Sequence, residues 1–335
     1  MSARLNRGMN AVKILRQIFG NTALMAFLLS VAMFAVLRVI KPNAATLSSL
    51  STVLANTSML IFACAGQMII ITSGGGGIDL SAGAIMSTAA VITVETMNGD
   101  PSMLVPSFLL CLAAGALFGL LNGVGAAYIK IPALIMTLCV SNILGRFQLV
   151  ISQGAPRGTV AGVLTRSLTA KYGVTPLLPD LIPGIAIWAA VFYAVVVLFL
   201  KYTKYGYRLS LIGTNFEAAR LSGVRAKRTQ MLAYVIGGML AGLGGYVGAG
   251  YFRQMQPATF DGYTMQSIAA VVIGGTLLSG GRANYAGTVF GALLLTVLSQ
   301  FLIAFNTSVA LRYIIMGAML IALLVAYHRK PAIRQ

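Results

Sequence analysis

The chain has 335 residues, of which 58% are hydrophobic and only 9% are charged, and its mean hydropathy is +0.87. This composition excludes an ordinary soluble domain and indicates an integral membrane protein. The formal net charge of +18 would also fit a nucleic-acid-binding protein. The basic residues, however, lie at the ends of apolar runs rather than on one face, so the positive-inside rule explains them better and we expect no nucleic-acid partner.

Ten apolar runs follow one another along the chain. About 20 apolar residues cross about 30 Å of hydrocarbon at about 1.5 Å per residue, and most of the runs reach that length. We therefore expect an all-α fold, a polytopic integral membrane helical bundle of about ten transmembrane helices, as a single domain over residues 1–335. The runs are residues 21–40, 50–72, 78–94, 103–128, 131–153, 182–200, 231–251, 265–278, 285–304 and 309–327.

The basic residues divide unequally between the ends of these runs. Ten crossings return the C-terminus to the side of the N-terminus, where we count sixteen Lys and Arg against seven on the other side. We therefore expect both termini in the cytoplasm, with residues 1–20 as a cytoplasmic N-terminal segment. A cleaved signal peptide fits less well, because the first apolar run is too long for a signal core.

Glycines occur in two patterns, and the first is spacing by four residues within an apolar run. Small residues at this spacing mark helix faces that pack closely in a membrane, so we interpret these glycines as structural. They are Gly115, Gly119 and Gly123 in the run 103–128, and the pairs Gly238/Gly242 and Gly244/Gly248 in the run 231–251.

The second pattern consists of glycines that interrupt a run. Residues 73–77 read Ser-Gly-Gly-Gly-Gly before a short run, and residues 279–281 read Ser-Gly-Gly after the shortest one. Two short, glycine-interrupted segments in the two halves of a transporter point to its translocation site. The hypothesis makes four of these glycines candidate pathway or gating residues: Gly76, Gly77, Gly280 and Gly281.

Five polar residues in or beside the predicted spans are candidates for the pathway. Asp79 precedes a helix start, where it either contacts substrate or a gate, or caps the helix together with Ser81, and the sequence leaves both open. Arg146 lies well inside a span with Asn142 one turn away, and a cation at that depth should face the bundle interior or water. Two weaker pathway candidates, Gln67 and Asn122, can instead simply bond a neighbouring helix.

The polar stretch 201–228 carries seven basic residues and one acidic residue, so we place the loop 201–230 in the cytoplasm. Within it, residues 213–223 predict a short capped helix. Asn215 can accept a hydrogen bond from the first turn, Glu217 suits the positive helix end, and Gly223 can adopt the left-handed conformation that ends a helix. A small exposed helix of this kind predicts a docking element for a soluble protein.

Patterns of catalytic and metal-binding residues are missing from the sequence. His328 is the only histidine and is followed by Arg329 and Lys330 near the C-terminus, no acidic pair has metal-binding spacing, and there is no phosphate-binding loop. We therefore expect a transporter subunit rather than an enzyme, without metal or cofactor of its own. Three single cysteines read as small packing residues: Cys64, Cys111 and Cys139.

Several blocks, in order along the chain, carry a family resemblance. They are residues 76–81 (Gly-Gly-Ile-Asp-Leu-Ser), Asn122-Gly123, residues 130–133 (Lys-Ile-Pro-Ala) with Thr137-Leu138 and Arg146, the Glu-Ala-Ala-x-x-x-Gly pattern at 217–223, residues 269–276 (Ala-Ala-Val-Val-Ile-Gly-Gly-Thr) and residues 279–282 (Ser-Gly-Gly-Arg). Over residues 50–327 the chain resembles the membrane permease subunit of bacterial ATP-binding-cassette importers for simple sugars, the ribose/xylose/galactose permease group.

The resemblance implies a location in the bacterial inner membrane and a set of partners. These are a cytoplasmic ATPase subunit that binds ATP and Mg, a periplasmic sugar-binding protein, and a second permease copy, identical or related. It also implies that the loop helix couples to the ATPase through Asn215, Glu217, Ala218, Ala219, Arg220 and Gly223.

Two departures from the family pattern bear on these expectations. Gly74 and Gly75 are extra glycines before the first block, and Gln266 lies where the family has an acidic run, so we take Gln266 as a further candidate contact. The alternative is an ion- or proton-coupled secondary carrier for a small polar solute, which would need titratable groups such as Asp79 inside the membrane.

Overall fold

The computed structural model describes residues 21–154, 158–172 and 181–328. The predicted cytoplasmic segment 1–20 lies outside the described residues. The fold class is confirmed, because every predicted apolar run contains a helix. These helices are α2 (Thr22–Ile40), α3 (Leu47–Thr72), α4 (Ala82–Met97), α5 (Leu104–Val124), α6 (Ala133–Ser152), α8 (Gly184–Tyr202), α11 (Ala226–Phe252), α12 (Tyr263–Ile273), α13 (Tyr285–Ala304) and α14 (Val309–His328).

Among the described residues, seven helical segments are long and apolar enough to cross a membrane. They are α2, α3, α6, α8, α11, α13 and the segment Pro101–Ile129, in which a short π-helix (Gly125–Ile129) extends α5. α4 and α12 are apolar but shorter, and each begins or ends at an interrupting glycine segment. The helix in the run 78–94 therefore starts four residues later than predicted, and the helix in the run 265–278 ends at Ile273.

The most extensive contact between two helices is that of α5 with α11, and glycine makes it possible. A Cβ on Gly115 would overlap the carbonyl group of Gly238, and one on Gly119 would overlap the carbonyl group of Tyr234. A Cβ on Gly242 would likewise meet the carbonyl group of Cys111. The two backbones therefore approach more closely than any other residue permits, as the spacing predicts. We call this set of glycines, Gly115, Gly119, Gly123, Gly238 and Gly242, the glycine ridge.

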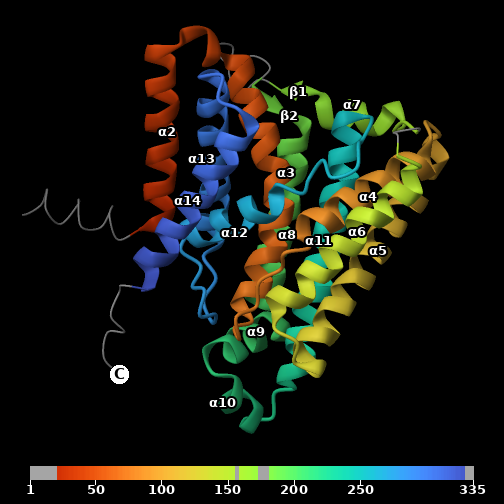
Figure 1. The fold of residues 1–335 in the computed structure, drawn as a ribbon, viewed down its shortest axis with the longest axis vertical. Helices are drawn as coiled ribbons and strands as arrows, with labels where there is room; N and C mark the ends of the chain where they lie inside the picture. Colours follow the sequence, from red (N-terminus) through yellow and green to blue (C-terminus); the bar gives the residue numbers. More distant parts are fainter. Residues whose placement is uncertain (1–20, 155–157, 173–180, 329–335) are drawn as a thin grey trace, which may run out of the picture.

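Figure 1 shows polar elements at the two opposite ends of the bundle. At one end lie α9 (Lys204–Thr214) and α10 (Phe216–Leu221), and at the other lie α7 (Gly162–Thr169) and the strands β1 (Lys171–Tyr172) and β2 (Ile182–Pro183). The two strands pair antiparallel, with Lys171 opposite Pro183. Neither α7 nor this strand pair is predicted by hydropathy, because both lie in the polar connection between two spans.

Candidate functional site: the α9–α10 element and the glycine junction

α10 is the short capped helix that the sequence predicts. The Asn215 side chain accepts a hydrogen bond from the Ala218 N–H at 3.0 Å, and Gly223 follows the helix with a φ of +82°. The Glu217 carboxylate lies 2.7 Å from the Arg220 guanidinium, one turn further along. Capping and the stop are local, so residues within one segment fix both ends of this helix.

Packing holds α10 on one face and leaves the other free. Ala219 is buried in a small apolar cluster with Ile212 of α9 and Ala226 of α11. Ala219 therefore anchors α10 to its own chain, whereas the other predicted coupling residues are exposed. Leu221 is 78% exposed, which leaves a large apolar side chain at the tip of the element. The exposed face of α10 combines an apolar tip, an ion pair and a rigid backbone, as a protein-docking surface needs.

The basic residues of the α10 end come from several segments. Lys130 follows Tyr128, whose ring lies 6.0 Å from the Lys227 ammonium, and Arg282 follows Gly281, which packs against Thr214. Lys130 and Arg282, which the count of basic residues places on the side of the termini, are therefore grouped with the 201–228 loop. This grouping strengthens the charge bias on which the predicted orientation depends.

The two glycine-interrupted segments meet each other beside α9. The Gly281 N–H donates to the Thr72 carbonyl at 3.0 Å, and a Cβ on Gly280 would overlap the backbone of Gly74. Gly213, in the last turn of α9, packs against both segments, since a Cβ there would overlap the Thr72 carbonyl and the Gly281 N–H. We call Gly74, Gly213, Gly280 and Gly281 the glycine junction.

The junction also depends on backbone conformations that favour glycine. Gly74, Gly75 and Gly76 have successive φ values of +74°, +65° and +71°, and Gly280 and Gly281 have values of +91° and +82°. The two extra glycines therefore form a turn of three left-handed residues together with Gly76, and Gly75 and Gly76 are exposed. Gly213 is two residues before Asn215, so the backbone of α9 and α10 connects the docking face to both breaks over a short distance in sequence.

Asp79 lies in a buried polar cluster that connects four helices. Its Oδ1 accepts hydrogen bonds from the Ser81 N–H at 2.7 Å and the Ser81 Oγ at 2.6 Å, while Asn122 donates to the same Oγ at 2.7 Å. With its amide oriented to satisfy both groups, Gln67 bonds the Asp79 backbone N–H and C=O, each at 3.2 Å. Thr137 of α6 accepts from the Leu80 N–H at 3.0 Å.

This cluster groups three of the predicted pathway residues, Gln67, Asp79 and Asn122, in one place. α4 begins at Ala82 with Ser81 as its N-cap residue, and the Asp79 carboxylate holds the Ser81 N–H. Asp79 therefore fixes the residue before α4, but in the described structure neither Asp79 nor Ser81 caps the first turn, and the Gly83 N–H donates to the Thr264 hydroxyl at 2.9 Å instead. Among the described residues, Asn122 Oδ1 is buried without a hydrogen-bond partner.

Arg146 and Asn142 differ from their predicted orientation. Both side chains are exposed on the outer face of α6, and the Asn142 amide donates to the Leu138 carbonyl of its own helix at 3.0 Å. The buried face of α6 is instead formed by Thr137, Val140, Leu144, Gln148 and Ser152. Of the two environments predicted for Arg146, the bundle interior or water, the interior of this chain is therefore excluded. Cys139 shares the outer face, so it is not a packing residue, whereas Cys64 and Cys111 are buried as expected.

Gln148 is a buried residue whose structural role the sequence did not reveal. Its amide donates to the Ala84 carbonyl and the Thr88 hydroxyl of α4, both at 3.1 Å, and accepts from the Ala258 N–H at 2.8 Å. It thus joins α6 and α4 to the segment before α12. The predicted contact Gln266 is half-buried on α12 and lies outside both the junction and the polar cluster.

Fold and site together define a multi-pass membrane transport subunit. The chain belongs to the family of permease components of branched-chain amino acid transport systems, whose model matches residues 48–324.

Three relatives illustrate the range of this family. The chain is 32% identical over 273 residues to the ribose import permease protein RbsC of Escherichia coli K12, and the aligned region covers 80% of this chain and 82% of that protein. It is 31% identical over 312 residues to the autoinducer 2 import system permease protein LsrC of Enterobacter sp. 638, covering 93% and 88%. It is 29% identical over 259 residues to RbsC of Bacillus subtilis, covering 77% and 78%. No solved structure gave a significant match.

Proposed function

We propose that this chain is the permease subunit of an ATP-binding-cassette importer in the bacterial inner membrane. It moves a monosaccharide or a similar small polar solute into the cell, and a separate cytoplasmic ATPase that binds ATP and Mg drives it. The observation that carries the proposal is the continuous path from the exposed face of α10 through Gly213 to both glycine breaks.

The mechanism follows from that path. An ATPase that holds α10 in a groove moves it when nucleotide binding closes the ATPase dimer. The cluster around Ala219 makes α9 and α10 move together, and Gly213 carries the movement to residues 73–77 and 279–281. Since these segments connect α3 to α4 and α12 to α13, the movement changes the tilt of spans in both halves of the chain.

The names of two relatives support a sugar-like cargo, because one imports ribose and the other autoinducer 2. An importer of this class also takes its solute from a periplasmic binding protein, which docks on the end that carries α7 and the β1–β2 pair. With the α10 end in the cytoplasm and the α7 end in the periplasm, both chain termini lie in the cytoplasm.

A second copy of the permease, identical or related, completes the pathway. A cation exposed to lipid is costly, and Arg146 lies on the outer face of α6 beside Asn142 and Cys139. We place the second copy on this face. Because Cys139 is exposed while the other two cysteines are buried, a short bismaleimide should cross-link two copies through Cys139 in membranes. A Cys139→Ala control should not cross-link, and a monomer from the wild-type chain would contradict this arrangement.

One transport experiment tests the function itself. The chain, its ATPase and the binding protein are reconstituted in vesicles, and uptake of ribose and related solutes is measured with ATP, without ATP, and with ATP plus a protonophore. The proposal predicts uptake that requires ATP and survives the protonophore. Uptake that the protonophore abolishes, or uptake by this chain alone, would support the alternative, an ion- or proton-coupled carrier.

A further inference from the structure

A cavity of about 870 Å³ opens at the α10 end of the bundle, between the last turns of α8, the start of α2 and the segment that leads into α13. Hydrogen bonds fix its frame, because the Tyr193 hydroxyl donates to the Tyr285 carbonyl at 2.7 Å and Asn284 donates to the Thr22 hydroxyl at 3.1 Å. The cavity is therefore a rigid space between three helices.

Two cations lie in its wall. Lys201 is at the end of α8, with its ammonium 5.6 Å from the centre of the Tyr285 ring, and Arg282 is exposed just before α13. No carboxylate lines the cavity, and neither cation forms a salt bridge with any residue that the structure describes. The first turn of α13 adds the positive end of a 20-residue helix. The cavity therefore favours an anion.

The remaining wall is apolar and runs toward the middle of the membrane-spanning helices. It is formed by Val197 of α8 and by Val289 and Phe290 of α13, all partly exposed. Val197 lies one turn before Lys201, and Val289 lies one turn after Tyr285, so charge and apolar surface follow each other along both helices. A soluble anion contacts only the charged part of such a site. A phospholipid contacts the charged part with its headgroup and the apolar wall with an acyl chain.

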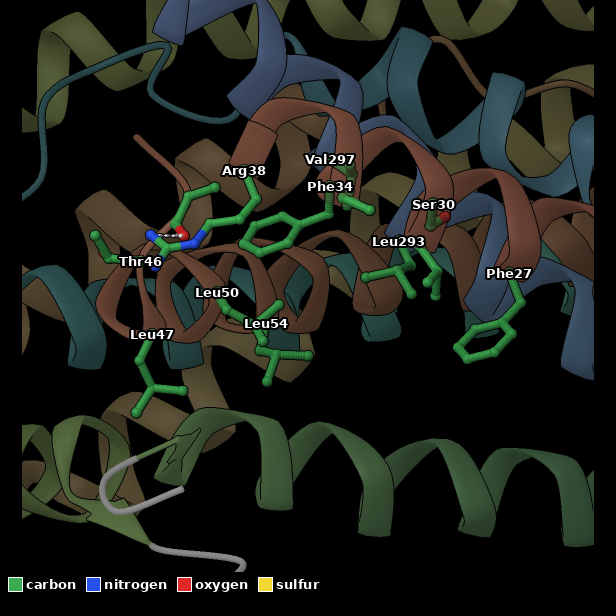
Figure 2. Close-up of a pocket in the computed structure, with 13 residues that line it drawn as sticks. Phe27, Ser30, Phe34, Arg38, Thr46, Leu47, Leu50, Leu54, Leu293 and Val297 are labelled. Carbon is green, nitrogen blue, oxygen red and sulfur yellow. Dashed lines mark hydrogen bonds between the residues drawn. The ribbon is translucent and has the colours of Figure 1, made fainter. Parts of the chain in front are cut away.

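A second groove in the same chain provides a contrast. It runs between α2, α3 and α13 and has a volume of about 760 Å³, and Figure 2 shows Phe27 at one end and Arg38 with Thr46 at the other. The rest of its lining is apolar except for Ser30, whose hydroxyl donates to the Ala26 carbonyl at 2.7 Å. The Arg38 guanidinium already donates to the carbonyls of Pro42 and Ala45 at 2.8 and 3.2 Å. Arg38 thus closes the α2–α3 turn, whereas the charged groups of Lys201 and Arg282 bond no backbone carbonyl among the described residues.

We propose that the cavity at Lys201 and Arg282 binds an anionic phospholipid of the surrounding bilayer. The phosphate lies between the two cations, and an acyl chain follows the wall formed by Val197, Val289 and Phe290. Basic pockets between membrane helices are known to select anionic headgroups in this way. Under the orientation proposed above the lipid belongs to the cytoplasmic leaflet, but the binding itself is independent of ATPase coupling.

Native mass spectrometry of the purified full-length chain tests the site. The detergent-solubilised chain is titrated with phosphatidylglycerol or with phosphatidylcholine of the same acyl chains. Each cation near an anionic lipid contributes about fivefold in affinity, so the wild type should bind its first phosphatidylglycerol at least about tenfold more tightly. A Lys201→Gln/Arg282→Gln double variant should lose this preference. A second variant, Ala286→Trp, fills the cavity and should weaken binding of both lipids.

The matched control is Lys204→Gln/Arg208→Gln, which removes two exposed cations from the same end but not from the cavity. It should keep the preference, and lipid-free melting temperatures report whether each variant folds. Equal affinity of the wild type for both lipids would overturn the proposal, as would an equal loss in the control. Displacement of phosphatidylglycerol by glycerol phosphate would show a free-anion site instead, and loss of a dimer only in the cavity variants would show a protein interface.

Discussion

Glycines are concentrated in two regions of this bundle, the ridge and the junction, and their structural roles differ between the two. The ridge glycines between α5 and α11 have ordinary helical backbones, and what matters is the missing Cβ, which lets two helices touch along their backbones. In the junction, Gly74, Gly280 and Gly281 also need left-handed backbone conformations. The ridge holds two helices together along their length, whereas the junction joins the ends of four helices to α9, and under the proposed mechanism these ends move with α9. The comparison indicates that stability and coupling depend on different glycines.

The largest effect is expected at the ridge. Gly119→Leu inserts a side chain where even a Cβ overlaps the Tyr234 carbonyl, so we expect a loss of at least about 3 kcal/mol in stability and little folded protein. The matched control is Gly317→Leu, because Gly317 on α14 is exposed and has no neighbour within 4 Å. Thermal melting of the solubilised chains measures both. Equal melting temperatures of the Gly119→Leu and Gly317→Leu variants would contradict the claim that the ridge stabilises the bundle.

A smaller loss of stability is expected at the junction, together with a loss of transport. Gly280→Ala strains a backbone with a φ of +91° and overlaps Gly74, which we expect to cost about 1–3 kcal/mol. Gly99→Ala is the control, because Gly99 has a φ of +83° in open space near the other end. Melting and ATP-driven uptake are measured on both. If the two variants lose transport equally, backbone strain alone explains the effect and the junction has no special part in coupling.

The polar cluster connects the two regions, since Asp79 follows the first glycine break and Asn122 lies between Gly119 and Gly123. Asn122→Ala removes the hydrogen bond to the buried Ser81 hydroxyl, so we expect a loss of about 1–3 kcal/mol. Asn142→Ala on the outer face of α6 should change the stability of the isolated chain by much less. A comparable loss at both positions, measured by melting, would contradict the placement of the cluster in the core.

The smallest effect is expected on the surface of α10. Glu217→Gln breaks an exposed ion pair with Arg220, which contributes about 1 kcal/mol or less to stability. We therefore expect an unchanged melting temperature and a modest fall, roughly two- to fivefold, in solute moved per ATP, because the pair orients the docking face. A drop in melting temperature without any change in transport would mean that Glu217 supports the fold rather than the coupling.

Some of this architecture follows from the sequence because its causes are local. The spans follow from apolar length, the ridge from spacing by four, and α10 from Asn215 and Gly223, which cap a helix six residues long. Each of these signals is contained within one helix or one turn.

Other features depend on contacts between distant segments. The sequence places Gly213 only at the start of the segment 213–223. Its contact with Thr72 and Gly281 exists only in the folded chain. Arg146 shows a second limit. Both faces of α6 carry apolar and polar side chains, since Thr137, Gln148 and Ser152 lie on the buried face, so hydropathy cannot tell which way Arg146 points.

The most direct test of the account is the ratio of solute imported to ATP hydrolysed by the reconstituted complex with Gly223→Val. Gly223 is exposed, a Cβ there would meet no other group within 4 Å, and its φ is +82°, so valine deforms only the end of α10, whereas Gly223→Asn tolerates that conformation. We predict that the valine complex assembles and hydrolyses ATP but imports little, and that the asparagine complex imports normally. Wild-type import per ATP by the valine complex would contradict the claim that α10 transmits the movement of the ATPase to the membrane-spanning helices.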